Sequence, residues 1–170
     1  TNDSQQYDNT NKNWNGQPTA ENDYSKISTI TVISSADMVN WVDHGEIEVS
    51  KIATWARNSW APAACHKTIN GREKFFLYFA DSANGIGVLE ADSPTGPFRE
   101  PSTGSRLISW GSQAASGVTW LFDPAVLVDD DGTGYLFFGG GVPEGMQADP
   151  GTVRCVQLGE DMISLACEPQ

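Results

Sequence analysis

One carboxylate lies inside an otherwise apolar stretch of the sequence. Residues 122–126 read FDPAV, so Asp123 is flanked by groups that cannot hydrate it. An unpaired carboxylate is costly to bury, and we expect hydrogen-bond or cationic partners that set its pKa. A titratable group in such a setting is a candidate for acid–base chemistry. The alternative is structural, because aspartate before proline is also a common turn former.

Two aromatic residues stand at matching positions before a proline. Trp60 lies in residues 58–62 (NSWAP), and Phe122 immediately precedes Asp123. A flat ring suits the C–H face of a sugar, and an indole adds one N–H donor. Trp60 and Phe122 are therefore candidate substrate-binding residues, with aromatic packing between sheets as the alternative.

The acidic run at residues 129–132 (DDDG) lacks the spacing of a calcium loop. An EF-hand loop that began at Asp129 would need glutamate at its twelfth position, where Gly140 stands. A tight hairpin turn closed by Asp131 and Gly132 is the better interpretation. We identify no metal-binding residues, and no residue pattern requires a cofactor.

The candidate residues belong to a repeat of about 62 residues. Pro62 and Pro124 are separated by 62 positions, and an NG or DG turn follows each of them. An Asp-Met pair returns after 124 positions, which is twice that period. The matching segments are 60–63 and 122–125, 70–71 and 131–132, and 37–38 and 161–162.

Between the turns the chain consists of short β-type runs, and no stretch shows apolar spacing of 3.6 residues over three turns. We expect an all-β fold with strands at 27–34, 75–80, 85–89, 125–128 and 135–138. A unit of about 62 residues with four short strands is typical of a β-propeller blade. The chain would hold about 2.7 such blades, whereas a propeller closes with about four to eight.

We interpret residues 1–170 as one partial propeller domain. The outer half of a first blade is expected at 1–51, a second blade at 52–110, with its outer strand near Phe98, and most of a third at 111–170. Residues 1–25 contain six asparagines and are predicted to be an exposed loop. Because an incomplete ring leaves strand edges open, we expect the remainder of the propeller to come from further sequence or from a second chain.

Composition excludes several classes of partner. Ten Lys and Arg stand against 22 Asp and Glu, a net charge of −12, which argues against nucleic acid and anionic membranes. The longest apolar run, residues 75–80, is far shorter than the roughly 20 residues of a membrane-spanning helix. Three cysteines are too few for a disulfide scaffold. Cys155 and Cys167 either bridge neighbouring strands or are plain buried thiols.

Several segments together resemble the five-bladed propeller enzymes of glycoside hydrolase family 43. The resemblance runs from about Ile27 to Leu165 in the order of the family. It implies an inverting glycosidase that acts on arabinose- or xylose-containing plant polysaccharides, such as arabinoxylan, arabinan or xylo-oligosaccharides. The segments are 34–41 (SSADMVNW), 58–62 (NSWAP), 85–88 (GIGV), 92–98 (DSPTGPF), 122–126 (FDPAV) and 129–132 (DDDG).

The resemblance also implies roles for individual residues. In the family a base Asp and an acid Glu are assisted by a third Asp, and its pKa-modulating role falls to Asp123. Trp60 is implied to line the subsite of the cleaved sugar. The positions one repeat before Ala61 and one repeat after Asp123 lie outside residues 1–170. We therefore expect both proton-transfer carboxylates outside this chain. The 170 residues alone are predicted to be inactive.

α-L-Arabinofuranosidase action on arabinoxylan is the leading expectation, followed by β-xylosidase and endo-arabinanase action. Two other functions remain open: a non-catalytic glycan-binding propeller, and a scaffold in which Asp123 is structural. The resemblance implies an extracellular location, although the first residues, TNDS, show no signal-peptide features. A central-channel calcium, found in some family members, would draw on later blades.

Overall fold

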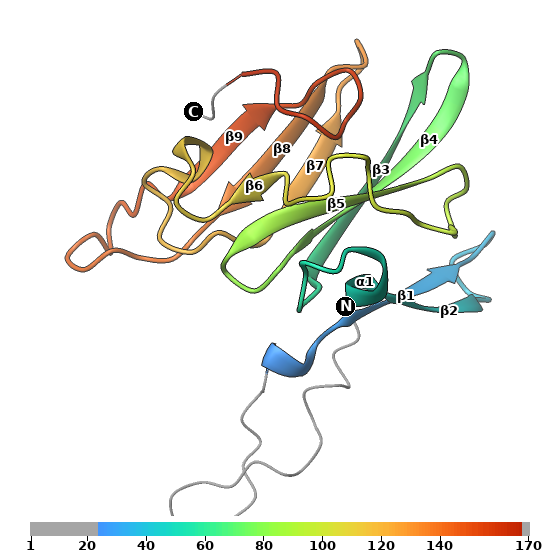
Figure 1. Ribbon diagram of the computed structural model, residues 1–170, viewed down its shortest axis with the longest axis horizontal. Coiled ribbons are helices and arrows are strands. Elements are labelled where there is room, and N and C mark those ends of the chain that lie inside the picture. The colour runs from blue at the N-terminus through green and yellow to red at the C-terminus, as the bar shows by residue number, and fades with distance from the viewer. Residues whose placement is uncertain (1–23, 168–170) are drawn as a thin grey trace, which may run out of the picture.

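The computed structural model describes residues 24–167 as three antiparallel sheets that follow one another in chain order (Figure 1). Their orders are β1-β2, β3-β4-β5-β6 and β7-β8-β9. Helix is limited to η2 (Tyr24–Lys26), α1 (Val49–Ile52) and η3 (Gln113–Ala115). The all-β fold class is confirmed, and residues 1–23, predicted to be part of an exposed loop, lie outside the described residues. The strands are β1 (Thr29–Ser34), β2 (Val42–Glu48), β3 (Trp60–Ile69), β4 (Arg72–Ala80), β5 (Gly85–Ala91), β6 (Ile108–Ser109), β7 (Ala125–Val128), β8 (Gly134–Gly139) and β9 (Val153–Gln157).

Both predicted hairpin turns are present. Asn70 and Gly71 have φ of 51° and 75°, the left-handed pair that a two-residue hairpin turn requires. At the second turn the N–H of Gly132 donates to the carbonyl of Asp129 at 2.8 Å, and β7 and β8 pair on either side. The acidic run 129–132 is therefore the tip of a hairpin.

The Asp-Met repeat of the sequence is also a repeat of the backbone. Met38 and Met162 have φ of 61° and 62°. Oδ1 of the preceding aspartate accepts hydrogen bonds from the N–H groups two and three residues further on, at 2.9 and 2.7 Å for Asp37 and at 3.0 Å for both bonds of Asp161. The same tight turn thus forms at both ends of the described chain.

The second sheet is covered on both faces. Alternate residues of β4 point to opposite sides, so Phe76 and Tyr78 join one buried cluster and Leu77 and Phe79 the other. The first cluster continues into the third sheet, and the second contains residues of β1 and α1. This double coverage explains why residues 75–80 are apolar without interruption.

One edge of β5 pairs with β4, and the opposite edge pairs with two separate segments of the chain. Ile86 and Gly85 pair with β6, and Glu90 forms an isolated bridge with Arg99. The outer strand expected near Phe98 is reduced to this single bridge at Arg99, and Phe98 itself packs against the cluster of β1, β4 and β5. The outer strand of this sheet is β6, about ten residues further on.

Within residues 24–167, no helix has the length and apolar character needed to cross a membrane. The three cysteines are free thiols: Cys65, Cys155 and Cys167. The disulfide considered between Cys155 and Cys167 is therefore not formed in this structure. Cys155 is half-buried and Cys167 is exposed.

Candidate active site

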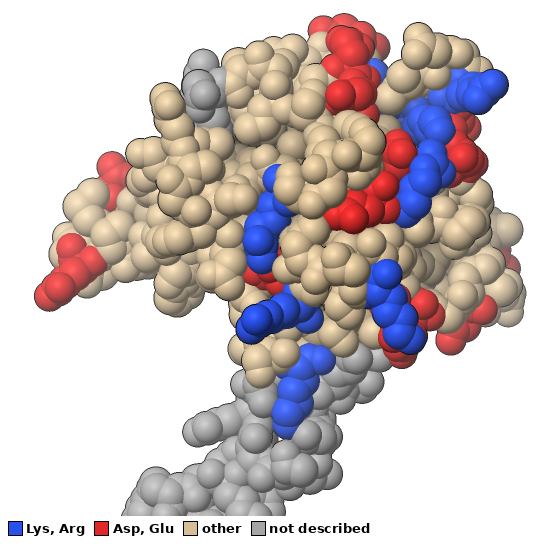
Figure 2. Space-filling model, viewed as in Figure 1, with Lys and Arg blue, Asp and Glu red and all other residues tan. Residues whose placement is uncertain are grey.

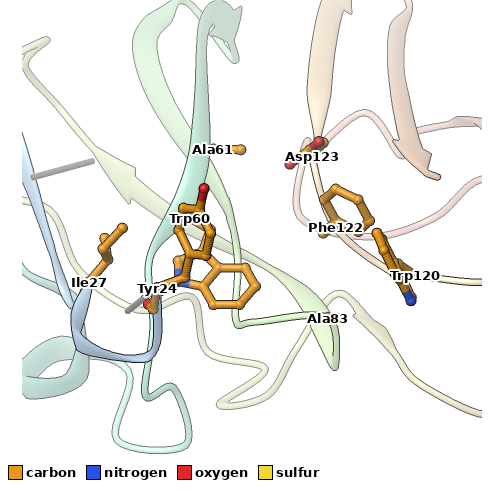
Figure 3. Close-up of a pocket in the computed structure, with 8 residues that line it drawn as sticks. All are labelled: Tyr24, Ile27, Trp60, Ala61, Ala83, Trp120, Phe122 and Asp123. Carbon is orange, nitrogen blue, oxygen red and sulfur yellow. Dashed lines mark hydrogen bonds between the residues drawn. The ribbon is translucent and has the colours of Figure 1, made fainter. Parts of the chain in front are cut away.

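An aromatic cleft of about 700 Å³ opens between the second and third sheets. Figure 3 shows Trp60 and Tyr24 on one side, Phe122 and Trp120 on the other, and Ala61 facing Asp123 across the gap. The three residues selected from the sequence, Trp60, Phe122 and Asp123, are thus brought together. Asp123 carries the one carboxylate among the residues that line this cleft. The lining residues are Tyr24, Ile27, Trp60, Ala61, Ala83, Trp120, Phe122 and Asp123.

One wall of the cleft consists of Trp60 and Tyr24. The indole Nε1 of Trp60 donates to the backbone carbonyl of Tyr24 at 2.7 Å. The two rings meet edge to face, with centroids 6.0 Å apart and planes at 65°. Because the indole N–H is already bonded to the backbone, this wall presents a fixed apolar surface to the cleft.

The opposite wall consists of Phe122 and Trp120, whose ring centroids are 5.7 Å apart. Trp120 is 55% exposed, and its backbone N–H donates to the carbonyl of Gly140 at 3.1 Å. A Cβ at Gly141, which has φ of 82°, would lie 2.8 Å from the Thr119 side chain. The glycines of residues 139–141 therefore let the chain approach this wall closely.

Ala61 and Asp123 share an unusual backbone conformation one repeat apart. Their φ angles are 42° and 50°, in the left-handed region that L-residues avoid, and a proline follows each of them. In Figure 3 the methyl group of Ala61 points toward Asp123. Residues held in this region cost about 1–3 kcal/mol each and cluster at functional sites.

The same two corners interrupt strand pairing in the same way. Between Trp60 and Ala63 the register of β3 against β4 shifts by one residue. In the third sheet the N–H of Gly139 donates to the carbonyl of Phe122 at 3.0 Å, one position out of register with the pairing that begins at Ala125. Bulges of this kind re-aim side chains at the rims of sheets.

The carboxylate of Asp123 projects into the open cleft. Partial desolvation raises the pKa of this carboxyl above its ordinary value of 3.8. The hydrogen-bond or cationic partner expected from the sequence is absent among residues 24–167, so that expectation is wrong for the described chain. The left-handed corner explains the difference, because it turns the side chain toward the cleft, where water reaches it.

Asn58 holds the Tyr24 side of the cleft from behind. This buried residue donates from Nδ2 to the carbonyls of Ser25 at 2.8 Å and Ile27 at 2.9 Å. Its Oδ1 accepts from the hydroxyl of Ser82 at 2.6 Å. One amide thereby ties the segment that carries Tyr24 to the β4–β5 turn.

A buried ion pair supports Asn58 in turn. Asp81 accepts the backbone N–H groups of Arg57 at 2.8 Å and Asn58 at 3.0 Å, and its other oxygen pairs with Arg106. The Arg106 guanidinium lies 5.0 Å from the ring centroid of Trp55. The loop that leads into β3 is therefore fixed before the chain reaches Trp60.

Sequence reasoning missed Tyr24, Trp120 and Asn58. Two of them carried a usable signal, because Asn58 and Trp120 lie 62 positions apart and each precedes a cleft aromatic by two residues. In an extended chain residues i and i+2 share a face. Tyr24 carried no such signal, since only the fold brings it to Trp60.

Among residues 24–167, no group of three or more His, Cys, Asp or Glu side chains is placed to hold a metal ion. The described residues therefore supply no ligand set for the central-channel calcium that the resemblance raised. No step proposed below uses a metal.

Known proteins are similar to this chain in sequence and in fold. Residues 17–170 match the sequence model of Glycosyl hydrolases family 43. Arabinoxylan arabinofuranohydrolase of Paenibacillus polymyxa is 56% identical over 158 residues, and the counterpart from Bacillus subtilis (strain 168) is 52% identical over 160. Each alignment covers 85% of this chain, but only 25% and 31% of those proteins.

A crystal structure of a family 43 arabinoxylan arabinofuranohydrolase from Bacillus subtilis, in complex with cellotetraose, superimposes with a TM-score of 0.84 and 48% identity. The match covers 94% of this chain and 36% of that chain. The chain thus spans about a quarter to a third of the length of these relatives. Because the family model matches residues 17–170, and these relatives share about half of the aligned residues, the chain belongs to glycosyl hydrolases family 43.

Proposed function

We propose that these 170 residues form the aromatic half of the active site of an inverting arabinofuranosidase that acts on arabinoxylan. The observation that carries the proposal is the lone, unpartnered carboxylate of Asp123 in a cleft walled by four aromatic rings. The names of the relatives from Paenibacillus polymyxa and Bacillus subtilis supply the substrate class. A polymeric substrate also implies action outside the cell.

The aromatic walls suit a sugar ring. Trp60 and Phe122 lie on opposite sides of the cleft, so that a furanose or pyranose placed between them would bury its C–H faces against both. Ala61 contributes only a methyl group opposite Asp123, which leaves space for the ring.

Asp123 is proposed to modulate the general acid, with no proton transfer of its own. Inverting hydrolysis needs an acid that protonates the leaving oxygen and a base that takes a proton from water, with the two carboxyls about 6.5–9.5 Å apart. Only one carboxylate lines the cleft formed by residues 24–167. The positions one repeat before Ala61 and one repeat after Asp123 fall outside residues 1–170, so we propose that both proton-transfer groups come from further sequence. A negative charge beside the acid raises the pKa of that acid and keeps it protonated at working pH.

Two measurements on the complete polypeptide that carries this chain test the assignment. We expect Asp123→Asn to lower kcat on an aryl α-L-arabinofuranoside at least a hundredfold. The alkaline limb of its pH–rate profile should also move to lower pH, because removal of the charge lowers the pKa of the acid. Asp130→Asn, in the exposed β7–β8 turn, is the matched control. An unchanged rate and profile for Asp123→Asn would show that the residue is structural.

A non-catalytic glycan-binding role is the second candidate, favoured by the presence of a single carboxylate in the cleft. If this role is right, the complete polypeptide will be retarded in an arabinoxylan-containing gel but will release no arabinose. Release of arabinose from the same polymer would exclude it.

A further inference from the structure

A second cavity lies beside the aromatic cleft, on the segment between β6 and β7. It measures about 550 Å³, and one of its walls is Trp110, which is 53% exposed. Polar groups come from Ser112, Gln113 and Ser116.

The residues that line this cavity are uncharged, which suits a neutral ligand. The Arg154 guanidinium beside Gly117 is bonded to the backbone carbonyls of Ser116, Gly151 and Val153. From residue 107 to residue 122 the sequence contains no Asp, Glu, Lys, Arg or His, although the whole protein carries a net charge of −12. The side chains of the cavity offer the indole face of Trp110, the amide of Gln113 and the hydroxyl of Ser116. The hydroxyl of Ser112 is buried. Figure 2 shows a largely uncharged surface over the β6–η3 region, while charged side chains gather over β3–β5 and the N-terminal hairpin. A sugar ring needs this combination of stacking face and neutral hydrogen-bonding groups.

The segment is held in one conformation before any ligand binds. Backbone hydrogen bonds join Ala115 to Ser112 at 3.1 Å and Ser116 to Gln113 at 3.0 Å. The Arg154 guanidinium donates to the carbonyl of Ser116 at 3.1 Å. A preorganised site loses little conformational entropy on binding.

The two cavities are joined by the β4–β5 turn. The backbone N–H of Trp110 donates to the carbonyl of Asn84 at 2.8 Å, and Asn84 forms a parallel bridge with Leu121. Ala83, next to Asn84, lines the aromatic cleft, as does Trp120, next to Leu121. The β4–β5 turn is therefore adjacent to residues that line both cavities.

We propose that the Trp110 cavity is a second glycan subsite, which binds a neutral pyranose of the polymer whose side-chain sugar occupies the aromatic cleft. This inference rests on the proposed function for the identity of the polymer. Trp110 stacks on the ring, and Gln113 and Ser116 bond its hydroxyls. The subsite affects recognition of the polymer and plays no part in bond cleavage.

The test compares a polymer with a small substrate in the complete polypeptide. We expect Trp110→Ala to lower the ratio of kcat/KM on arabinoxylan to kcat/KM on an aryl α-L-arabinofuranoside about tenfold, equivalent to about 1.4 kcal/mol. Trp110→Phe keeps a ring and should lower the ratio about threefold, as should Gln113→Ala. Trp41→Ala is the matched control, since Trp41 is 47% exposed and lines neither cavity.

Gel retardation by soluble arabinoxylan supplies a readout that needs no catalysis. Trp110→Ala should be retarded less than wild type and than Trp41→Ala. If the polypeptide releases no arabinose yet shows this difference, the proposed catalytic function fails and the subsite stands. If arabinose is released but the ratio and the retardation match wild type in all three variants, the subsite is wrong. A lower melting temperature of Trp110→Ala with unchanged retardation would assign Trp110 to packing and also overturn it.

Discussion

Two corners of the chain, residues 60–62 and residues 122–124, have the same backbone conformation but carry different side chains. Both place a non-glycine residue at positive φ, both precede a proline and both shift the strand register by one residue. One corner presents a methyl group to the cleft and the other presents a carboxylate. The comparison shows that the scaffold of the site is repeated while its chemistry depends on a single side chain.

The two corners also differ in what supports them. Asn58, two residues before Trp60, is buried and bonds carbonyls of a remote segment. Trp120, at the same place before Phe122, is half-exposed and forms part of the cleft wall. The first corner therefore depends on a polar network behind it, and the second on close packing of residues 139–141.

Moving the carboxylate from one corner to the other should have the largest effect. We expect Asp123→Ala to lower kcat of the complete polypeptide roughly a thousandfold, within the range for loss of assistance to a general acid. Adding Ala61→Asp should restore none of this, because the charge then lies on the opposite side of the cleft. Recovery to within tenfold of wild type in a steady-state assay would mean that the two corners are interchangeable.

The next largest difference between the two corners should be in stability, when the residue two positions before each cleft aromatic is replaced. Asn58→Ala deprives the carbonyls of Ser25 and Ile27 of a buried donor, and we expect a loss of about 3 kcal/mol in urea unfolding. Trp120→Ala, at the matching position, should cost about 1 kcal/mol or less, because its side chain is half-exposed. Equal losses would refute the distinction between a polar network and surface packing.

Relief of backbone strain should give a smaller change of opposite sign. Ala61→Gly removes the steric cost of φ 42° and is expected to stabilise the protein by about 1 kcal/mol. The control is Ala64→Gly, on the same strand without a positive φ, which should destabilise by about 0.5–1 kcal/mol. Destabilisation by both glycines would show that the corner is unstrained.

The smallest expected effect is the pH dependence of stability at Asp123. Because the folded-state pKa of this carboxyl is raised, its ionised form is less favourable in the folded protein. The resulting cost is absent below the ordinary pKa of 3.8, grows as pH rises through the raised value, and is constant above it. Asp123→Asn should therefore melt slightly higher than wild type at pH 7 and equally at low pH.

Asp131→Asn is the control of opposite sign for the same melting experiment. Hydrogen bonds from Thr133, led by that of its backbone N–H, lower the pKa of the Asp131 carboxyl. Its ionised form therefore contributes stability, which is lost as pH falls through the lowered value. Equal shifts in both variants would point to a general charge effect in this acidic protein.

Local patterns predicted much of the fold. The strand predicted at 125–128 coincides with β7. This apolar run is bounded by a proline before it and by a DG turn after it. The repeat allowed the sequence to predict Trp60, Phe122 and Asp123 as one site. Equivalent positions of successive repeats occupy equivalent places in the fold. What escaped were contacts between distant segments. Tyr24 contacts Trp60 across 36 positions of the chain, and Phe98 packs into the core where a strand was expected.

The shared left-handed corner at Ala61 and Asp123 has a genetic consequence. The alanine codons GCU and GCC differ from the aspartate codons at a single base, and the two equivalent corners have the same φ to within about ten degrees. One point mutation can therefore add or remove an acidic group in this cleft without any change of fold.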